Sequence, residues 1–312
     1  MNRAVIDLGS NTIRLIVYRC EGRKFTTMFR QKEIAGLAGY VENKRLKVDG
    51  IDKACVILRG FREIAVRFVD ERDIHMFATA ALRGIINQNQ VLETIRSACG
   101  VLPEVLSGEE EARLDFIGAS YFTECRDGVL IDIGGASTEL VRFQSGQPTE
   151  LASLPIGCLS LYTEFVGKII PTEKERKKIK KAIRAQFDQN IGWLSAKPTA
   201  KSLLMIGVGG TVRAAHKLSC GLFALPEEQK NVKRVCVHEI LKMLKANEHK
   251  IYHTLYKLVP ERILTIFTGL LILNGAMKRL NCDSFFVSGC GVREGYLIDR
   301  VLANVGCPPL EF

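Results

Sequence analysis

The sequence carries one short motif twice, and this duplication restricts the possible folds more than any other feature. The segment AVIDLGSNTIRLIVYR stands near the N-terminus, and the segment VLIDIGGASTELVRFQ stands near the middle of the 312-residue chain. Aligned without a gap, Asp7 matches Asp132 and Gly9 matches Gly134. Self-similarity inside one chain indicates a repeated structural unit. We therefore expect two related halves, each built around one copy of the motif.

Each copy predicts a strand, a turn of small residues and a second strand. An apolar run (residues 4–6 and 129–131) ends at the aspartate, and β-branched residues follow the turn (residues 13–18 and 138–143). Glycine in such a turn lets the backbone approach a ligand and present amide N–H groups to phosphate oxygens. The neighbouring aspartate can hold a divalent cation that neutralises those phosphates. Two such hairpins predict a two-sided phosphate clamp.

The segments after each hairpin are also alike. In the first half we expect strands at 25–34, 74–77 and 101–106, and helices at 49–68, 88–99 and 109–122. In the second half we expect strands at 150–154, 203–206 and 284–287, and a final helix at 292–303. Each half then fits an α/β fold, a ribonuclease-H-like mixed sheet surrounded by helices, with ligands at the carboxyl ends of strands. We place domain I at residues 1–123, with 298–312 able to rejoin it, and domain II at 124–297.

Composition and charge exclude several classes of protein. The ten cysteines occur singly, without the CxxC or Cys/His spacing of a zinc site. The most apolar stretch, residues 263–277, is shorter than the roughly 20 residues that span a bilayer, so we expect a buried helix and no membrane partner. Without an export signal before the first strand, we expect a cytoplasmic protein with reduced thiols.

The formal net charge of +10, most of it after residue 123, favours an anionic partner. The densest basic run, residues 174–184, predicts a helix that either is a solvated face or borders the substrate site. No recognition module or pattern of stacking aromatics indicates sequence-specific binding of nucleic acid. We expect a polyanionic phosphate substrate and a homodimer.

Four further segments lie at predicted strand ends, and each also has a purely structural explanation. Arg83 in TAALR could grip a phosphate through two hydrogen bonds or lie at the surface. The glycines of GVGGT open a helix whose amides suit phosphate, and SGCGVREG follows the last strand. In SGEEEAR, Ser107 could cap a helix, whereas one glutamate could act as a general base for water.

Together these segments resemble the exopolyphosphatase / guanosine pentaphosphate phosphatase family, which belongs to the superfamily of actin, heat-shock chaperone ATPases and sugar kinases. The matching segments occur in family order: DLGSN from Asp7, TAALR from Thr79, SGEEEAR from Ser107, DIGGASTE from Asp132, GVGGT from Gly207 and VSGCGVREG from Val287. They span residues 7 to 295, which is almost the whole chain.

The resemblance implies a role for each matched residue. Glu110 would be the catalytic base and Arg83 the arginine that grips phosphate. The acids Asp7, Asp132 and Glu139 would hold Mg²⁺, with Mn²⁺ as an alternative. The substrate phosphates would lie on the turns formed by Ser10, Asn11, Gly134, Gly135, Ser137, Gly209, Gly210, Thr211 and Gly289.

The sequence departs from the family in two ways. Ala136 stands where the family usually has a third glycine, which would cost about 1–3 kcal/mol if its φ angle were positive. Longer family members also carry a helical C-terminal extension tied to long-chain polyphosphate handling; the sequence ends at Phe312 without a matching segment, so we do not expect processive action on long polymers.

Three functions fit these observations. The first is a Mg²⁺-dependent hydrolase that releases terminal orthophosphate from polyphosphate, guanosine pentaphosphate or both. The second is a non-catalytic sensor of these anions, for which Ala136 is the one sequence argument. The third is a kinase of the same superfamily, although the sequence has no signature of an acceptor pocket. The sequence does not rank polyphosphate against guanosine pentaphosphate, because the predicted clamp contacts only phosphate groups.

Overall fold

The computed structural model describes residues 1–312 except 23, 122, 124, 193–202, 247–248 and 304–312. Contacts among the described residues divide the chain into two compact units, which we call unit 1 (residues 1–114 and 293–303) and unit 2 (residues 115–292). The chain passes between the units inside α3 (Gly108–Ser120) and at the start of α10 (Val292–Tyr296). The boundary expected from the sequence, after residue 123, lies beyond α3. Within the segment 298–312 that we expected to rejoin domain I, residues 304–312 lie outside the described residues.

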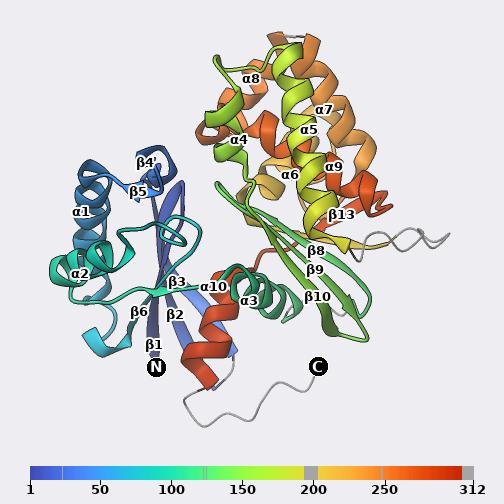
Figure 1. The fold of residues 1–312 in the computed structure, drawn as a ribbon. Helices are drawn as coiled ribbons and strands as arrows, with labels where there is room; N and C mark the ends of the chain where they lie inside the picture. Colours follow the sequence, from blue (N-terminus) through green and yellow to red (C-terminus); the bar gives the residue numbers. More distant parts are fainter. Residues whose placement is uncertain (23, 122, 124, 193–202, 247–248, 304–312) are drawn as a thin grey trace. The chain divides into compact units, whose positions relative to one another are not determined.

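Unit 1 contains a five-stranded mixed sheet in the order β3-β2-β1-β6-β7. Its strands are β1 (Asn2–Leu8), β2 (Thr12–Glu21), β3 (Lys24–Ile34), β6 (Ile74–Ala78) and β7 (Glu104–Val105). The helices α1 (Val48–Ala65) and α2 (Gln88–Cys99) lie together on one side of this sheet (Figure 1). In α1 the buried residues Ile51, Ala54, Leu58 and Phe61 recur with helical spacing, which gives the helix one apolar face for the core.

Unit 2 contains a six-stranded mixed sheet in the order β10-β9-β8-β11-β13-β12. Its strands are β8 (Gly128–Ile133), β9 (Thr138–Gln144), β10 (Gln147–Leu154), β11 (Met205–Val208), β12 (Asn231–Lys233) and β13 (Ser284–Val287). Its larger helices are α4 (Cys158–Phe165), α5 (Glu173–Asn190), α6 (Gly209–Phe223), α7 (Arg234–Ala246), α8 (His249–Leu258) and α9 (Ile266–Arg279). These helices gather on one side of the sheet (Figure 1).

The two hairpins have the same geometry. Asp7 pairs with Arg14 across β1 and β2, and Asp132 pairs with Glu139 across β8 and β9. In the first turn the amide of Gly9 donates to the Thr12 carbonyl at 3.1 Å, and the corresponding bond in the second turn is 2.9 Å long. Each first strand then pairs in parallel with the next core strand, β6 or β11. The predicted α/β class with mixed sheets is confirmed.

Several predicted elements differ in detail. The strand expected at 101–106 is reduced to β7, since Pro103 has no N–H to donate to a neighbouring strand. The helix expected at 292–303 consists of α10 and a π-helical segment, Leu297–Leu302. The short strand β12 and the small ribbon of β4 (Val41–Glu42) and β5 (Arg45–Leu46) were not expected.

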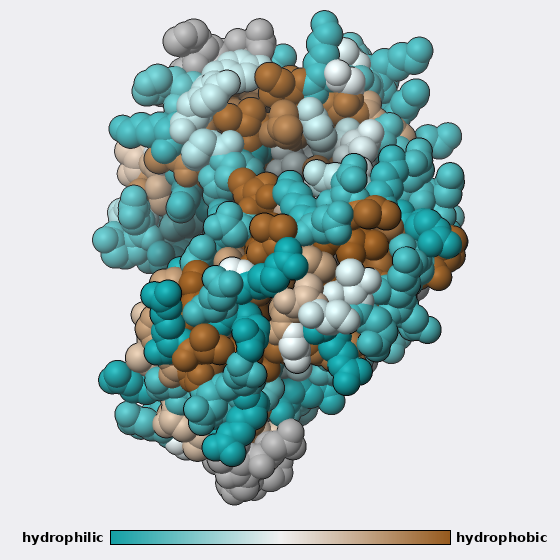
Figure 2. Space-filling view, turned by 90° about the vertical axis from the view of Figure 1, so that its left-hand side faces the viewer, coloured by the Kyte–Doolittle hydropathy of each residue, from teal (hydrophilic) through white to brown (hydrophobic). Residues whose placement is uncertain are grey.

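The apolar and basic stretches both form helices, as predicted. The apolar stretch forms α9, which is buried on nearly all sides within unit 2. The basic run forms α5, whose N-terminus is capped by Thr172 and Glu175. Among the described residues, no helix has both the length and the apolar composition that crossing a bilayer requires. Most of the face in Figure 2 is hydrophilic, and its apolar residues form separate patches.

The turn between β8 and β9 rests on the first residues of α4. The amides of Cys158 and Leu159 donate to the carbonyls of Gly134 and Gly135 at 2.9 and 2.8 Å. Gly157 precedes this helix, and a Cβ atom there would clash with the Gly135 carbonyl group and lie 2.5 Å from the Ala136 nitrogen. Only glycine therefore lets the second hairpin turn approach α4 so closely.

We expect Gly157→Ala to lower the free energy of unfolding by about 1–3 kcal/mol, because the added methyl group meets backbone that cannot rotate away. Urea denaturation of the whole chain measures this change. The matched control is Gly60→Ala in α1, where a Cβ atom meets nothing within 4 Å and the gain in helix propensity is about 0.5–1 kcal/mol. Equal stability of Gly157→Ala and the unchanged chain would contradict this close packing.

Candidate functional site

In unit 1, the aspartate of the first hairpin lies between two arginines. Asp7 is buried, and its Oδ2 atom lies 3.5 Å from Nη1 of Arg14 and 3.8 Å from Nε of Arg293. Guanidinium groups can bind a carboxylate and can also bind phosphate. Of the predicted turn residues, Ser10 and Asn11 accept hydrogen bonds through their carbonyl groups from the loop of residues 35–38. Those bonds fix the backbone of the turn.

Arg83 and Glu111 form a largely buried ion pair in unit 1. Arg83 follows β6, and its Nη1 atom donates to Oε2 of Glu111 at 3.0 Å and to the Leu106 carbonyl at 3.3 Å. The side chains are 24% and 10% exposed. Charge-assisted hydrogen bonds of this kind are stronger than neutral ones. The carboxylate beside the predicted phosphate-gripping arginine is therefore that of Glu111.

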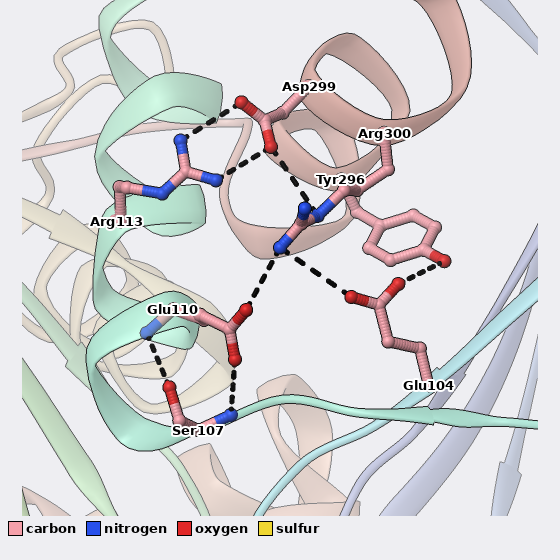
Figure 3. A network of polar contacts seen from close by, with 7 residues as sticks. All are labelled: Glu104, Ser107, Glu110, Arg113, Tyr296, Asp299 and Arg300. Atoms are coloured by element: carbon pink, nitrogen blue, oxygen red, sulfur yellow. Dashed lines mark hydrogen bonds and ion pairs between the residues drawn. The ribbon is translucent and has the colours of Figure 1, made fainter. Parts of the chain in front are cut away.

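Glu110, the predicted base, lies in a different contact (Figure 3). Its Oε2 atom accepts from the Ser107 amide at 2.9 Å, and its own amide donates to the Ser107 hydroxyl at 3.1 Å. This reciprocal pair is a capping box at the start of α3. Hydrogen bonds from Ser107, and then the charges of Arg300 and Arg113, lower the pKa of Glu110 against a smaller opposing effect of burial. Glu110 is therefore held as a carboxylate at the start of α3.

The first turn of α3 is also bound to the C-terminal helical segment of unit 1 (Figure 3). Arg300 donates to Oε1 of Glu110 at 2.9 Å and lies 3.6 Å from Glu104. Arg113 forms two hydrogen bonds with Asp299, at 2.9 and 2.7 Å. These contacts hold the backbone that carries Glu111.

Tyr296 completes this network from the same segment. Its hydroxyl donates to Glu104 at 2.9 Å. Burial and then the Glu104 carboxylate raise the pKa of Tyr296, so the phenol keeps the proton that it donates.

In unit 2, Asp132 and Glu139 are direct cross-strand neighbours on one face of the sheet. Side chains in such positions have Cβ atoms about 4.5–5.5 Å apart. Glu139 is 1% exposed, and the Ser153 hydroxyl donates to its Oε1 atom at 2.8 Å. Two adjacent carboxylates fit a hard divalent cation whose remaining ligands are water and phosphate oxygens.

The predicted acid Asp7 belongs to unit 1, whereas the other two predicted metal ligands belong to unit 2. Within the part of the chain that the structure describes, no group of three or more His, Cys, Asp or Glu side chains could hold a metal ion. A metal bound in unit 2 would therefore take only two protein carboxylates.

The turn between β11 and α6 lies against the second hairpin. Gly209 has a φ angle of +80°, and a Cβ atom there would clash with the Asp132 carboxylate and lie 2.9 Å from its Cγ atom. Thr211 is 1% exposed and donates to the Ile133 carbonyl at 3.0 Å, so its hydroxyl binds the hairpin. The helix start of α6 is thus fixed beside Asp132.

Arg262, which the sequence did not single out, lies against the same turn. A Cβ atom on Gly210 would clash with the Arg262 guanidinium and lie 2.7 Å from its Cζ atom. Arg262 ends a short 3-10 helix, Pro260–Arg262, and no motif in the sequence marks it. The structure therefore places a cation beside backbone amides at a helix start, which is an arrangement suited to phosphate.

The other predicted turn residues of unit 2 have mainly backbone roles. Gly134 and Gly135 accept hydrogen bonds from α4, and the Ser137 carbonyl closes the hairpin turn. Ala136 is not among the described residues with a positive φ angle, so the backbone strain considered for this position in the sequence analysis does not arise. A Cβ atom on Gly289 would meet nothing within 4 Å. Because β8, β11 and β13 are parallel neighbours, the turns after them meet at one sheet edge.

A family model matches residues 16–304 of this chain and describes the Ppx/GppA phosphatase family. The chain belongs to the Ppx/GppA phosphatase family. The match begins inside β2, after the first hairpin turn. A solved structure of the Aquifex aeolicus PPX-GPPA enzyme is similar, with 25% identity, coverage of 96% of this chain and 99% of that one, and a TM-score of 0.76.

An exopolyphosphatase from Cytophaga hutchinsonii has the same fold. It is 21% identical, the alignment covers 99% of this chain and 100% of that one, and the TM-score is 0.84. Members of the family thus share the two-domain, actin-like architecture over essentially their full length.

The pKa of Glu110 yields a stability prediction. Because folding lowers this pKa, its stabilising contribution is present above the unfolded value, near 4.5, and is lost as the pH falls through the folded value. We expect Glu110→Gln to be less stable than the unchanged chain by about 1 kcal/mol at pH 7, with the difference vanishing at acid pH. Urea denaturation at several pH values measures it. The control Glu109→Gln, at an exposed position, should change stability by less than about 0.5 kcal/mol.

Proposed function

We propose that this chain is a metal-dependent hydrolase that releases terminal orthophosphate from inorganic polyphosphate, guanosine pentaphosphate or both. The observation that carries this proposal is the 3.0 Å ion pair between Arg83 and Glu111, largely buried at the end of a core strand. It joins a phosphate-binding cation and a general-base carboxylate in one contact. Membership of a phosphatase family agrees with this chemistry.

In the proposed reaction, Glu111 rather than Glu110 acts on the attacking water. An incoming phosphate group competes with Glu111 for the guanidinium of Arg83, since both are anions that take paired hydrogen bonds. The released carboxylate can then orient a water molecule and accept its proton as the water attacks the terminal phosphorus. The bond between that phosphorus and the bridging oxygen breaks, so orthophosphate is released and the bridging oxygen stays on the shortened substrate as part of its new terminal phosphate. Arg83 remains on the phosphoryl oxygens, where negative charge accumulates during the transfer.

Each unit offers proposed phosphate contacts of its own. In unit 1 these are the arginines beside Asp7, and in unit 2 they are the amides at the start of α6 together with Arg262. Asp132 and Glu139 would hold Mg²⁺ or Mn²⁺, which would neutralise phosphate charge. Preorganised cations and amide dipoles of this kind stabilise the transition state of phosphoryl transfer.

All of these contacts recognise phosphate groups, so the two substrates stay alternatives within the proposal. The sensor alternative depended on strain at Ala136, and the backbone there does not have the positive φ angle that this argument needs. The hydrolase is therefore the better-supported reading of this site.

We expect Glu111→Gln to lower kcat for phosphate release by about 10²–10⁴, which is the usual contribution of a general base. Glu110→Gln, the matched control one residue earlier, should change kcat by less than about tenfold, because it removes a cap worth about 1 kcal/mol. Orthophosphate release from polyphosphate and from guanosine pentaphosphate, assayed side by side, measures both. The opposite order of the two variants would return the role of base to Glu110.

The proposed metal ligands give a separate test. Excess chelator should abolish phosphate release, and added Mg²⁺ or Mn²⁺ should restore it, since carboxylate oxygens select hard cations. Asp132→Asn should raise the Mg²⁺ concentration for half-maximal activity at least tenfold. Glu164→Gln, at an exposed position on α4, should leave it unchanged. Full activity in excess chelator would exclude a metal requirement.

A further inference from the structure

Unit 2 contains a second concave site that the proposed reaction does not use. It has a volume of about 1070 Å³ and is lined by α5, α7, α9 and the residues around β12 and β13. We call it the basic groove. None of the residues proposed above for catalysis, phosphate binding or metal binding lines it. Pockets of several hundred cubic ångströms and more are large enough for an organic ligand.

The rim of the basic groove is strongly cationic. Lys180 and Arg184 lie one turn apart on α5, so they project from the same face of the helix. Lys278 on α9 and Lys233 at the end of β12 add two further positive charges. Two acids, Asp188 and Asp283, also line the groove, and Asp188 is paired with Arg279 at 3.1 Å. Basic side chains therefore outnumber acidic ones around the opening.

These cations lie close enough to affect one another. Partial burial, and then the positive charges of Lys245, Arg176 and Lys278, lower the pKa of Lys180. A bound anion would offset this mutual repulsion, whereas a cation or a neutral ligand would not.

The floor of the basic groove is apolar. Ile183 and Phe187 of α5 and Leu271 of α9 line it, and all three are less than 5% exposed. Gly275 lies beside them, and a Cβ atom there would lie 3.4 Å from Ile183 and 3.5 Å from Phe187. Gly275 thus lies in close contact with this floor. At the rim, Val235 is 57% exposed, although it is apolar.

We propose that the basic groove binds a nucleoside polyphosphate. The base would lie on the apolar floor, and the phosphates would lie among the lysines and arginines of the rim. An inorganic polyphosphate chain carries no apolar surface and would gain nothing from the floor. A purely apolar ligand would gain nothing from the rim. The groove thus selects an anion that also has a flat apolar part.

Isothermal titration of the whole chain with GTP, in excess chelator to prevent turnover, tests this site directly. We expect the double variant Lys180→Glu, Lys278→Glu to raise the Kd for GTP at least tenfold, while phosphate release from polyphosphate stays within about twofold. The matched control is Lys178→Glu, Lys181→Glu, which makes the same change of charge on α5 outside the groove. This control should change the Kd less than threefold.

Two further titrations assign the bound ligand and its position. Inorganic tripolyphosphate should bind at least tenfold more weakly than GTP to the Arg83→Ala variant, in which the catalytic contact is removed. GTP binding itself should survive in that variant. Loss of GTP binding in Arg83→Ala would place it at the catalytic residues. An equal loss of GTP affinity in the two lysine double variants would show that GTP is held only by general attraction to positive charge and not by the basic groove. Tripolyphosphate binding as tight as that of GTP would show that the apolar floor takes no part.

Discussion

The ion pair between Arg83 and Glu111 is the contact on which the candidate site of unit 1 depends. Removing two charges from water costs several kcal/mol per ion, so such a pair is maintained only where its geometry is good. Arg83 is fixed by the turn after β6, where its amide donates to the Thr79 carbonyl and its guanidinium to that of Leu106. Glu111 is fixed by α3, and the first turn of that helix is bound on two sides.

The C-terminal segment of unit 1 supplies one of those sides. Asp299 and Arg113 are separated by 186 positions in the chain, yet two hydrogen bonds join their side chains. Arg300 binds Glu110 from the same segment. Contacts from residues far away in the sequence therefore help to hold the first two turns of α3, which carry Glu111.

The sequence predicts the duplicated hairpins, most core strands and the basic helix at 174–184, because each depends on local periodicity. The family resemblance implies Glu110 as the base, whereas the spacing of Ser107 and Glu110 is also that of a capping box, which is compatible with the role that we propose for Glu111. The contacts of Arg262 and Arg300 cannot be predicted from the sequence. Tertiary packing alone brings Arg262 beside Gly210 and Arg300 beside Glu110. The π-helical segment likewise has no local signature in the sequence.

The two copies of the hairpin have diverged at one position that changes their chemistry. The residue opposite the aspartate is Arg14 in the first copy and Glu139 in the second. In the first copy the carboxylate lies beside a guanidinium group, which can offset its charge and can also bind phosphate. Two adjacent carboxylates repel each other unless a cation lies between them or one takes up a proton. On the same backbone form, the first hairpin therefore places an acid opposite a base, whereas the second places two acids opposite each other. Carboxylates are the ligands that we propose for Mg²⁺, and guanidinium groups are those that we propose for phosphate. The duplication thus supplies two turns of similar backbone form, and the residue opposite the aspartate gives each turn its own charge.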